Sequence, residues 1–72
     1  MWSVQIKANG LSFYGTVAEI EMVELPGVDV INLVTETGDV WLRKDACNIK
    51  DDGMLIEYAT KDISATFEYL GT

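Results

Sequence analysis

Apolar and polar residues alternate through the first eight positions of the chain, which is the pattern of a strand with one buried face. The apolar members of this alternation are Trp2, Val4, Ile6 and Ala8. The dipeptide Asn9-Gly10 follows directly, and Asn-Gly is a strong signal for a two-residue hairpin turn. We therefore predict a strand over residues 2–8 that turns back on itself at Asn9.

A second extended stretch runs from about Ser12 to Glu24, again with a period of two. Its apolar even positions are Ala18, Ile20 and Met22, and its acidic odd positions are Glu19 and Glu21. Thirteen residues at about 3.3 Å each would span about 43 Å, whereas a globule of this size is roughly 30 Å across. The strand must therefore bend or protrude. Gly15 is the predicted bend, because a glycine inside a strand often marks a bulge or a barrel corner.

A turn is predicted at Pro26-Gly27, because Pro favours the second place of a type II turn and Gly the third. A third strand follows, from about residue 28 to residue 36. If these two residues alone form the loop, the facing pairs are Met22 with Ile31, Ile20 with Leu33 and Ala18 with Thr35. This register joins two apolar faces. It also places Glu24 opposite Asp29, a repulsion that a wider loop would relieve.

The turn at Thr37-Gly38 leads into a fourth strand, and its register stays open. A two-residue loop pairs Leu33 with Leu42, whereas a bulged three-residue loop pairs Leu33 with Trp41. Because neighbouring residues of a strand point to opposite faces, this choice decides whether Trp41 is buried or exposed.

The C-terminal part of the chain predicts a short helical turn over residues 44–46 and a three-stranded meander. Its turns are expected at Asp52-Gly53 and Lys61-Asp62. The facing pairs are then Cys47 with Tyr58, Ile49 with Ile56, Ile56 with Phe67, Tyr58 with Ala65 and Met54 with Tyr69. All of these pairs fall on one face, and the other face is polar except for Leu55.

We therefore predict an all-β chain in which residues 1–72 form one small domain with no substantial helix. Six or seven short antiparallel strands, one of them bent, favour either a small barrel or a curled meander. Either architecture is similar in size to SH3-like and Sm-like barrels, a likeness of size and strand pattern only.

Acidic residues outnumber basic ones by twelve to five, which gives a net charge of −7. This charge disfavours nucleic acid as a partner, because affinity for polyphosphate rests mainly on Lys and Arg. It also disfavours an anionic membrane surface, and no apolar run of about 20 residues predicts a membrane span. We therefore expect the chain to bind neither nucleic acid nor a membrane.

Histidine, the commonest general base and metal ligand, is absent, and Cys47 is the one cysteine. A catalytic triad of the serine-protease kind cannot be built without histidine. A lone cysteine cannot complete a tetrahedral zinc site within one chain. Segment 51–53 resembles a calcium loop, but ligand positions three and twelve would be Lys50 and Ala59. We therefore predict no metal and no cofactor.

Two carboxylate pairs, Glu19 with Glu21 and Glu57 with Glu68, have the residue types of an acid–base dyad. Such chemistry needs a cleft and one carboxyl group shielded from water. The exposed strands of a 72-residue domain leave little room for either. We therefore predict that the protein is not an enzyme and has no catalytic residues.

The acidic group Glu19, Glu21, Glu24 and Asp29 is the most suggestive functional feature. Alternate residues of a strand share one face about 7 Å apart, close to the phosphate spacing of a nucleic-acid strand. One interpretation is a negative surface that binds a basic surface of a partner protein. In its sharper form, the chain is a phage or mobile-element inhibitor that mimics nucleic acid. The other interpretation is a solvated face that protects a strand from aggregation.

A second hypothesis is a ligand-binding barrel in which Trp41 and Arg43, two residues apart on one strand, act together with Tyr14. Aromatic stacking beside a guanidinium is how small barrels hold single-stranded bases, and an oligosaccharide is the other ligand considered. The competing interpretation buries Trp41 in the core and pairs Arg43 with a carboxylate. A third hypothesis is a self-assembling homo-oligomer in which the apolar run 28–34 supplies a sticky edge.

Cys47 is interpreted as a small buried apolar residue. A lone thiol fits a reducing compartment. No leader of basic, apolar and small residues precedes the first strand. We therefore expect a cytoplasmic protein.

Overall fold

The computed structural model describes residues 1–71 and confirms the all-β fold, with eight strands and two short 3₁₀ turns in these residues. The strands are β1 (Trp2–Ala8), β2 (Leu11–Val17), β3 (Ile20–Glu24), β4 (Val30–Thr35), β5 (Gly38–Arg43), β6 (Cys47–Lys50), β7 (Leu55–Ala59) and β8 (Ile63–Tyr69). The 3₁₀ turns are η1 (Lys44–Ala46), as predicted, and η2 (Asp51–Gly53). In this part of the chain no helix has the length and apolar character that crossing a bilayer requires.

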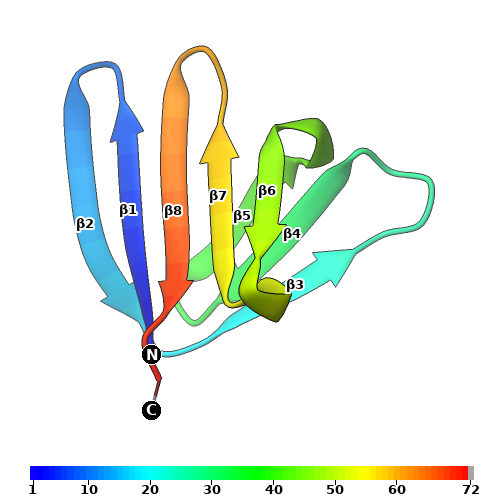
Figure 1. Ribbon diagram of the computed structural model, residues 1–72, viewed down its shortest axis with the longest axis horizontal. Helices are drawn as coiled ribbons and strands as arrows, with labels where there is room; N and C mark the ends of the chain where they lie inside the picture. Colours follow the sequence, from blue (N-terminus) through cyan, green and yellow to red (C-terminus); the bar gives the residue numbers. More distant parts are fainter. Residues whose placement is uncertain (72) are drawn as a thin grey trace.

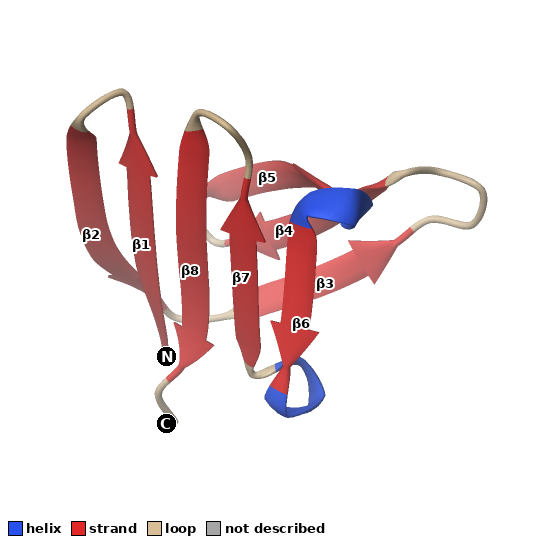
Figure 2. Ribbon diagram, turned by 45° about the horizontal axis from the view of Figure 1, so that its top comes forward, coloured by secondary structure: helices blue, strands red, loops and turns tan. Residues whose placement is uncertain are grey.

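The strands form two antiparallel sheets, a five-stranded sheet in the order β2-β1-β8-β7-β6 and a three-stranded sheet in the order β3-β4-β5. Figure 1 and Figure 2 show the three-stranded sheet behind β6, β7 and β8, with β2 at the far end of the larger sheet. The two sheets do not close into a barrel. Of the two predicted architectures, the barrel is therefore wrong, and the strand number is eight rather than six or seven.

The long bent strand predicted over residues 12–24 is divided into β2 and β3, which belong to different sheets. The division lies at Ala18 and Glu19, three residues beyond the predicted bend. Gly15 stays in the ladder opposite Val4. The physical reason is a competing acceptor, since the backbone N–H of Ala18 donates to the carboxylate of Glu36 at 2.7 Å.

The hairpin between β3 and β4 keeps the predicted faces but not the predicted register. The observed pairs are Ile20 with Thr35, Met22 with Leu33 and Glu24 with Ile31, a shift of two positions. The turn itself is present, because Val28 N–H donates to the Leu25 carbonyl at 3.3 Å and Gly27 has φ +74°. The loop is nevertheless five residues long, from 25 to 29. This wider tip separates Glu24 from Asp29 and relieves their repulsion.

The register between β4 and β5 matches neither alternative left open by the sequence. The chain turns at residues 36–37, so Leu33 lies opposite Val40 and Asn32 lies opposite Trp41. Leu42 points into the core opposite Ile31, and Trp41 therefore points outward, with 56% of its surface exposed. The competing interpretation, in which Trp41 packs in the core, is wrong.

The C-terminal meander has the predicted register throughout. Ile56 pairs with Ile49 on one side and with Phe67 on the other, and Tyr58 pairs with Cys47 and Ala65. Just before β7 begins, the carbonyl of Met54 accepts the N–H of Tyr69 at 2.8 Å, as the predicted pairing of Met54 with Tyr69 requires. The hairpin at Asn9-Gly10 is also confirmed, and both turn residues have positive φ, 52° and 78°.

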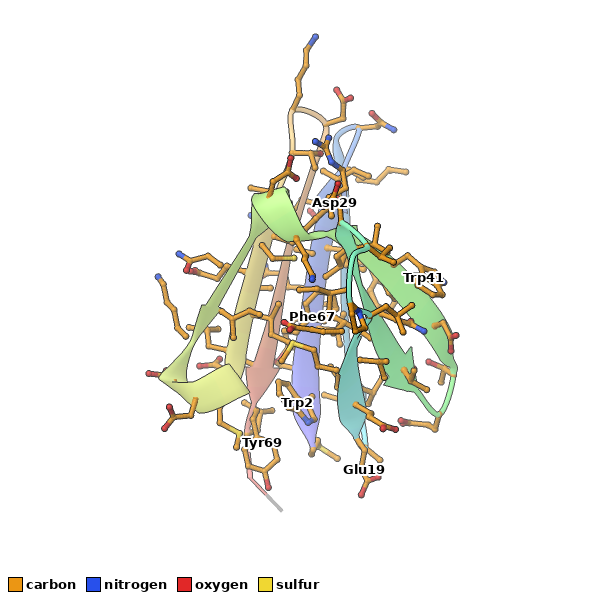
Figure 3. All side chains as sticks on the ribbon, turned by 90° about the vertical axis from the view of Figure 1, so that its right-hand side faces the viewer. Trp2, Glu19, Asp29, Trp41, Phe67 and Tyr69 are labelled. Atoms are coloured by element: carbon orange, nitrogen blue, oxygen red, sulfur yellow. The ribbon has the colours of Figure 1, made fainter. Side chains whose placement is uncertain are left out.

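The core lies between the two sheets and is small. Its buried residues are Trp2, Val4, Ile31, Leu33, Leu42, Ile56, Ala65 and Phe67. Leu33 is fully buried, and the Trp2 and Tyr69 rings pack edge to face with their centroids 5.4 Å apart (Figure 3). The apolar run 28–34, expected as a sticky edge, forms most of β4. Because β4 is paired on both sides, this run offers no free edge.

Candidate functional site

The candidate site is the outer face of the three-stranded sheet, the side turned away from the five-stranded sheet. Strand alternation and register place eight side chains on this face. They are Glu21, Val23, Val30, Asn32, Val34, Asp39, Trp41 and Arg43. We call this surface the acidic–aromatic face, because carboxylates gather at one end of it and an exposed tryptophan lies next to them.

The acidic end is built from a cross-strand row and a loop. Glu21 lies opposite Val34, and Val34 lies opposite Asp39, so the two carboxylates flank the valine. Glu21, Glu19 and Glu36 line an open hollow of about 370 Å³ together with Val34. Three carboxylates therefore surround this hollow, and Asp39 lies on the neighbouring strand opposite Val34.

Glu36 has both a structural role and a place in this acidic end. Its carboxylate accepts the N–H of Ala18 at 2.7 Å and that of Glu19 at 3.5 Å, which holds the crossing between the sheets. The Ala18 hydrogen bond, the largest cause, holds the pKa of Glu36 below its ordinary value. Glu36 is therefore ionised at neutral pH and adds to the negative charge.

The four carboxylates have no basic partner within residues 1–71. The ion pairs found there join Arg43 to Asp45 and Lys50 to Glu57, each at 2.7 Å. The hydrogen bond to Glu57, followed by its charge, raises the pKa of Lys50. The charge of the acidic end is thus left open to a cation from outside the chain.

The row next to the acidic end consists of Val23, Asn32 and Trp41. The Asn32 side-chain amide N–H donates to the Asp39 carboxylate at 3.4 Å. Its carbonyl oxygen Oδ1 is buried and makes no hydrogen bond to residues 1–71. The exposed Trp41 ring therefore lies in one row with a polar side chain, Asn32, that is hydrogen-bonded to Asp39.

The structure divides the predicted acidic group. Glu19 and Glu21 lie together at the acidic end. Glu24 is on the opposite face of β3, on the side of Ile31. Asp29 lies at the other end of the molecule from Glu19, beside basic residues (Figure 3). The hollow around Asp29, about 520 Å³, is also lined by Arg43, Lys44 and Asp45.

The predicted ligand set is divided as well. Trp41 and Arg43 share the outer face of β5, and Arg43 is paired with Asp45, as the competing interpretation expected. Tyr14 lies opposite Gln5 on the outer face of the five-stranded sheet, which points the other way. The three side chains therefore cannot hold one ligand together.

Sequence reasoning missed Glu36 and Asp39. Both depend on the turn between β4 and β5, whose register the sequence left open. The sequence does hold one signal for Asp39. If the loop is placed at residues 36–37, the strand spacing aligns Asp39 with Glu21 across the sheet. Without that register, the acidic end looks like two unrelated charges.

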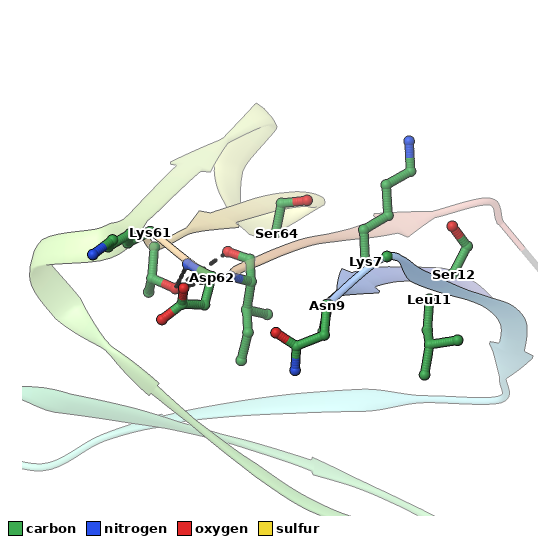
Figure 4. A pocket seen from close by; sticks show the side chains of 11 residues that line it. Lys7, Asn9, Leu11, Ser12, Lys61, Asp62 and Ser64 are labelled. Carbon is green, nitrogen blue, oxygen red and sulfur yellow. Dashed lines mark hydrogen bonds between the residues drawn. The ribbon is translucent and has the colours of Figure 1, made fainter.

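A separate open hollow of about 340 Å³ lies between the β1–β2 and β7–β8 turns (Figure 4). Lys7, Lys61 and Asp62 line it together with Leu11 and Ile63. The hydroxyl oxygen of Thr60 is already used, since it accepts the N–H of Ile63 at 3.1 Å. This hollow therefore has mixed charge and no free reactive group beyond exposed lysines.

Cys47 is partly buried, and burial followed by the charge of Asp45 raises the pKa of its thiol. Among the described residues, no three His, Cys, Asp or Glu side chains are grouped so as to hold a metal ion.

No protein-family model, curated protein or solved structure matches the chain. The acidic–aromatic face has its own chemistry for binding: carboxylates attract ammonium and guanidinium groups, and an exposed indole offers a stacking surface.

Proposed function

We propose that the protein is a non-catalytic interaction module that binds a basic surface of a partner protein through the acidic–aromatic face. The observation that carries this proposal is that Glu21 and Asp39, which have no basic partner within residues 1–71, share one sheet face with exposed Trp41. Glu19 and Glu36 add their negative charge at the hollow beside Glu21.

Charge and aromatic surface have separate tasks in this proposal. The carboxylates steer a basic partner toward the face and make the encounter faster and dependent on salt. Trp41 supplies the contact that keeps the complex together, because tryptophan is enriched among the few residues that dominate binding energy. The sheet backbone holds both groups in place, so little order has to be gained on binding.

The finer part of the proposal concerns the kind of partner. A net charge of −7 and the carboxylates of the acidic end resemble the charge of a nucleic-acid backbone more than its shape. We infer that the partner is a nucleic-acid-handling protein whose basic channel the chain blocks, as a phage or mobile-element inhibitor would. Glu24 and Asp29 take no part in this version, because they lie away from the acidic end. We also place the protein in the cytoplasm, where the free thiol of Cys47 would stay reduced.

The test is capture from a bacterial lysate on immobilised protein, with stepwise elution by salt and identification by mass spectrometry. The test variant is Glu21→Lys with Asp39→Lys. The matched control is Asp62→Lys with Glu68→Lys, which makes the same change of charge at exposed positions away from the face. We expect the test variant to lose the captured partner, or to release it at much lower salt, while the control retains it.

Two results would contradict the proposal. In the first, both double variants lose the partner equally, which would mean that only net charge matters. In the second, the test variant binds as the unaltered protein does. Circular dichroism of each variant shows whether the fold is retained, so loss of binding can be separated from loss of structure.

A further inference from the structure

Strand β2 is an edge strand without the usual protection. It ends the five-stranded sheet, and within residues 1–71 no strand pairs with its outer side. Its sequence, LSFYGTV, contains neither a charged residue nor a proline. Natural edge strands are usually guarded by charge, proline or a bulge, because an open edge templates pairing with another chain.

The other edge strands do carry such charges. β3 has Glu21 and Glu24, β5 has Asp39 and Arg43, and β6 ends at Lys50. The lack of charge in β2 is therefore a local property. It also extends to the whole β1–β2 hairpin, because all twelve acidic residues lie at position 19 or later and Lys7 is the one charged side chain before it.

The hairpin register determines which backbone N–H and C=O groups of β2 point away from β1, toward the open edge. In a two-residue hairpin, the residues that flank the loop, here Ala8 and Leu11, bond to each other. Alternation then directs the N–H and C=O groups of Ser12, Tyr14 and Thr16 to the open edge. The same alternation carried across β1 and β8 directs the N–H of Tyr69 to β7, where it donates to Met54 at 2.8 Å.

The side chains of β2 are apolar and uncovered. Leu11 and Phe13 lie on the face turned toward the three-stranded sheet, yet they are 76% and 59% exposed. The cause is visible in Figure 1 and Figure 2, where the three-stranded sheet lies behind β6–β8 and not behind β2. Tyr14 is 68% exposed on the opposite face. Both faces of this edge would gain by being covered.

We propose that two copies of the chain pair antiparallel through β2, about a two-fold axis at Tyr14, to join their larger sheets into one. This register sets Tyr14 opposite Tyr14 and Ser12 opposite Thr16, so every outward backbone group of the strand finds a partner. It also places Phe13 opposite Gly15 of the second copy, and because the Phe13 ring of each chain lies over its own Gly15, the two rings meet across the axis on one face.

The occupant is a second copy because of charge. Two chains of net charge −7 repel each other, and the β1–β2 hairpin is the region where they approach without acidic groups in contact. A basic partner, by contrast, finds no carboxylate on this hairpin to attract it. The pairing is independent of the partner-binding proposal and leaves the acidic–aromatic face open on each copy.

The test is sedimentation equilibrium of the purified protein over a wide range of concentration. The unaltered chain is expected to reach twice the monomer mass of 8.0 kDa. Tyr14→Lys puts two lysines face to face at the axis and should raise the dissociation constant on the order of tenfold or more. The matched control is Gln5→Lys, which makes the same charge change on the neighbouring strand β1, one strand removed from the axis.

A mixing experiment keeps the proposal falsifiable if either variant is less stable. Tyr14→Lys and Tyr14→Glu, each monomeric alone, should form mixed dimers when combined, because opposite charges then meet at the axis. A monomeric unaltered protein, a Tyr14→Lys variant that still dimerises as before, or equal loss of dimer in Gln5→Lys would each overturn the proposal. Capture of a different protein by a chain that stays monomeric would overturn it too.

Discussion

The acidic–aromatic face and the β1–β2 hairpin both expose aromatic side chains, but the first surface is strongly acidic and the second is nearly uncharged. Trp41 lies in the row next to Glu21 and Asp39 on one sheet face, whereas Phe13 and Tyr14 lie on a hairpin that carries one charged side chain, Lys7. Exposed aromatic surface therefore does not specify a partner by itself. Its electrostatic surroundings decide whether a basic protein or an uncharged edge can approach.

The largest effect is expected where both regions depend on the same residue. Leu33 is fully buried on β4, between the sheets. Leu33→Ala should cost about 2–5 kcal/mol of unfolding free energy, which is most of the roughly 5 kcal/mol expected for a domain of this size. Urea unfolding followed by circular dichroism measures it, and both partner binding and self-pairing should fail together.

The control for this prediction lies one residue away. Val34→Ala removes a half-buried side chain from the outer face of the same strand and should cost about 1 kcal/mol. If the two variants lose the same stability, the core is not where the structure places it.

A smaller effect should separate the two regions. Trp41→Ala should weaken partner binding about tenfold or more, with little change in unfolding, because the side chain is exposed. Phe13→Ala should instead weaken self-pairing and leave the affinity of each copy for the partner unchanged. Titration with the captured partner and sedimentation of each variant give the two readouts. If each variant changed partner binding and self-pairing alike, the two regions would not be separate binding sites.

The smallest expected effect concerns Glu36, which links the acidic end to the crossing between the sheets. Its pKa is lower in the folded chain than in the unfolded chain, so the ionised carboxylate stabilises the fold at neutral pH. That contribution should disappear as the pH falls through the folded-state pKa, which lies below the ordinary value of about 4.3. Thermal unfolding against pH measures it.

Glu36→Gln is the comparison for this pH dependence. It should lower the melting temperature modestly at pH 7 and flatten the loss of stability at acid pH. The same steep acid loss in both proteins would show that the carboxylate does not hold Ala18 as described.

The sequence predicted the C-terminal meander well because two independent signals agree there. The turns at residues 52–53 and 61–62 and the alternation of apolar residues give the same register. Between β3 and β4 the alternation gave the right face, but loop length was not encoded, and the register moved by two positions. A shift by two preserves which side chains are buried, so the pattern could not detect it.

The division between β2 and β3 could not be predicted from alternation, since the period of two continues through Ala18 and Glu19. What divides the strand is a hydrogen bond to Glu36, a residue 18 positions away from Ala18. Part of the candidate site could not be predicted for the same reason, because it depends on contacts between residues far apart in the sequence. The charge of Glu19 and Glu21 was visible, but their neighbours Glu36 and Asp39 depend on that fold and on the β4–β5 register.

The position of β1 in the larger sheet has a consequence for how the chain folds. β1 lies between β2 and β8, so Trp2 pairs with Tyr69 across almost the whole length of the chain. Pairing of such high contact order closes slowly, because a long loop must be ordered before any contact rewards it. We expect β1 and β2, which are joined by a local turn, to pair before β8 reaches them, and until then both edges of β1–β2 are open with Lys7 as the one charged side chain. In that interval a strand of another chain can take the place that belongs to β8.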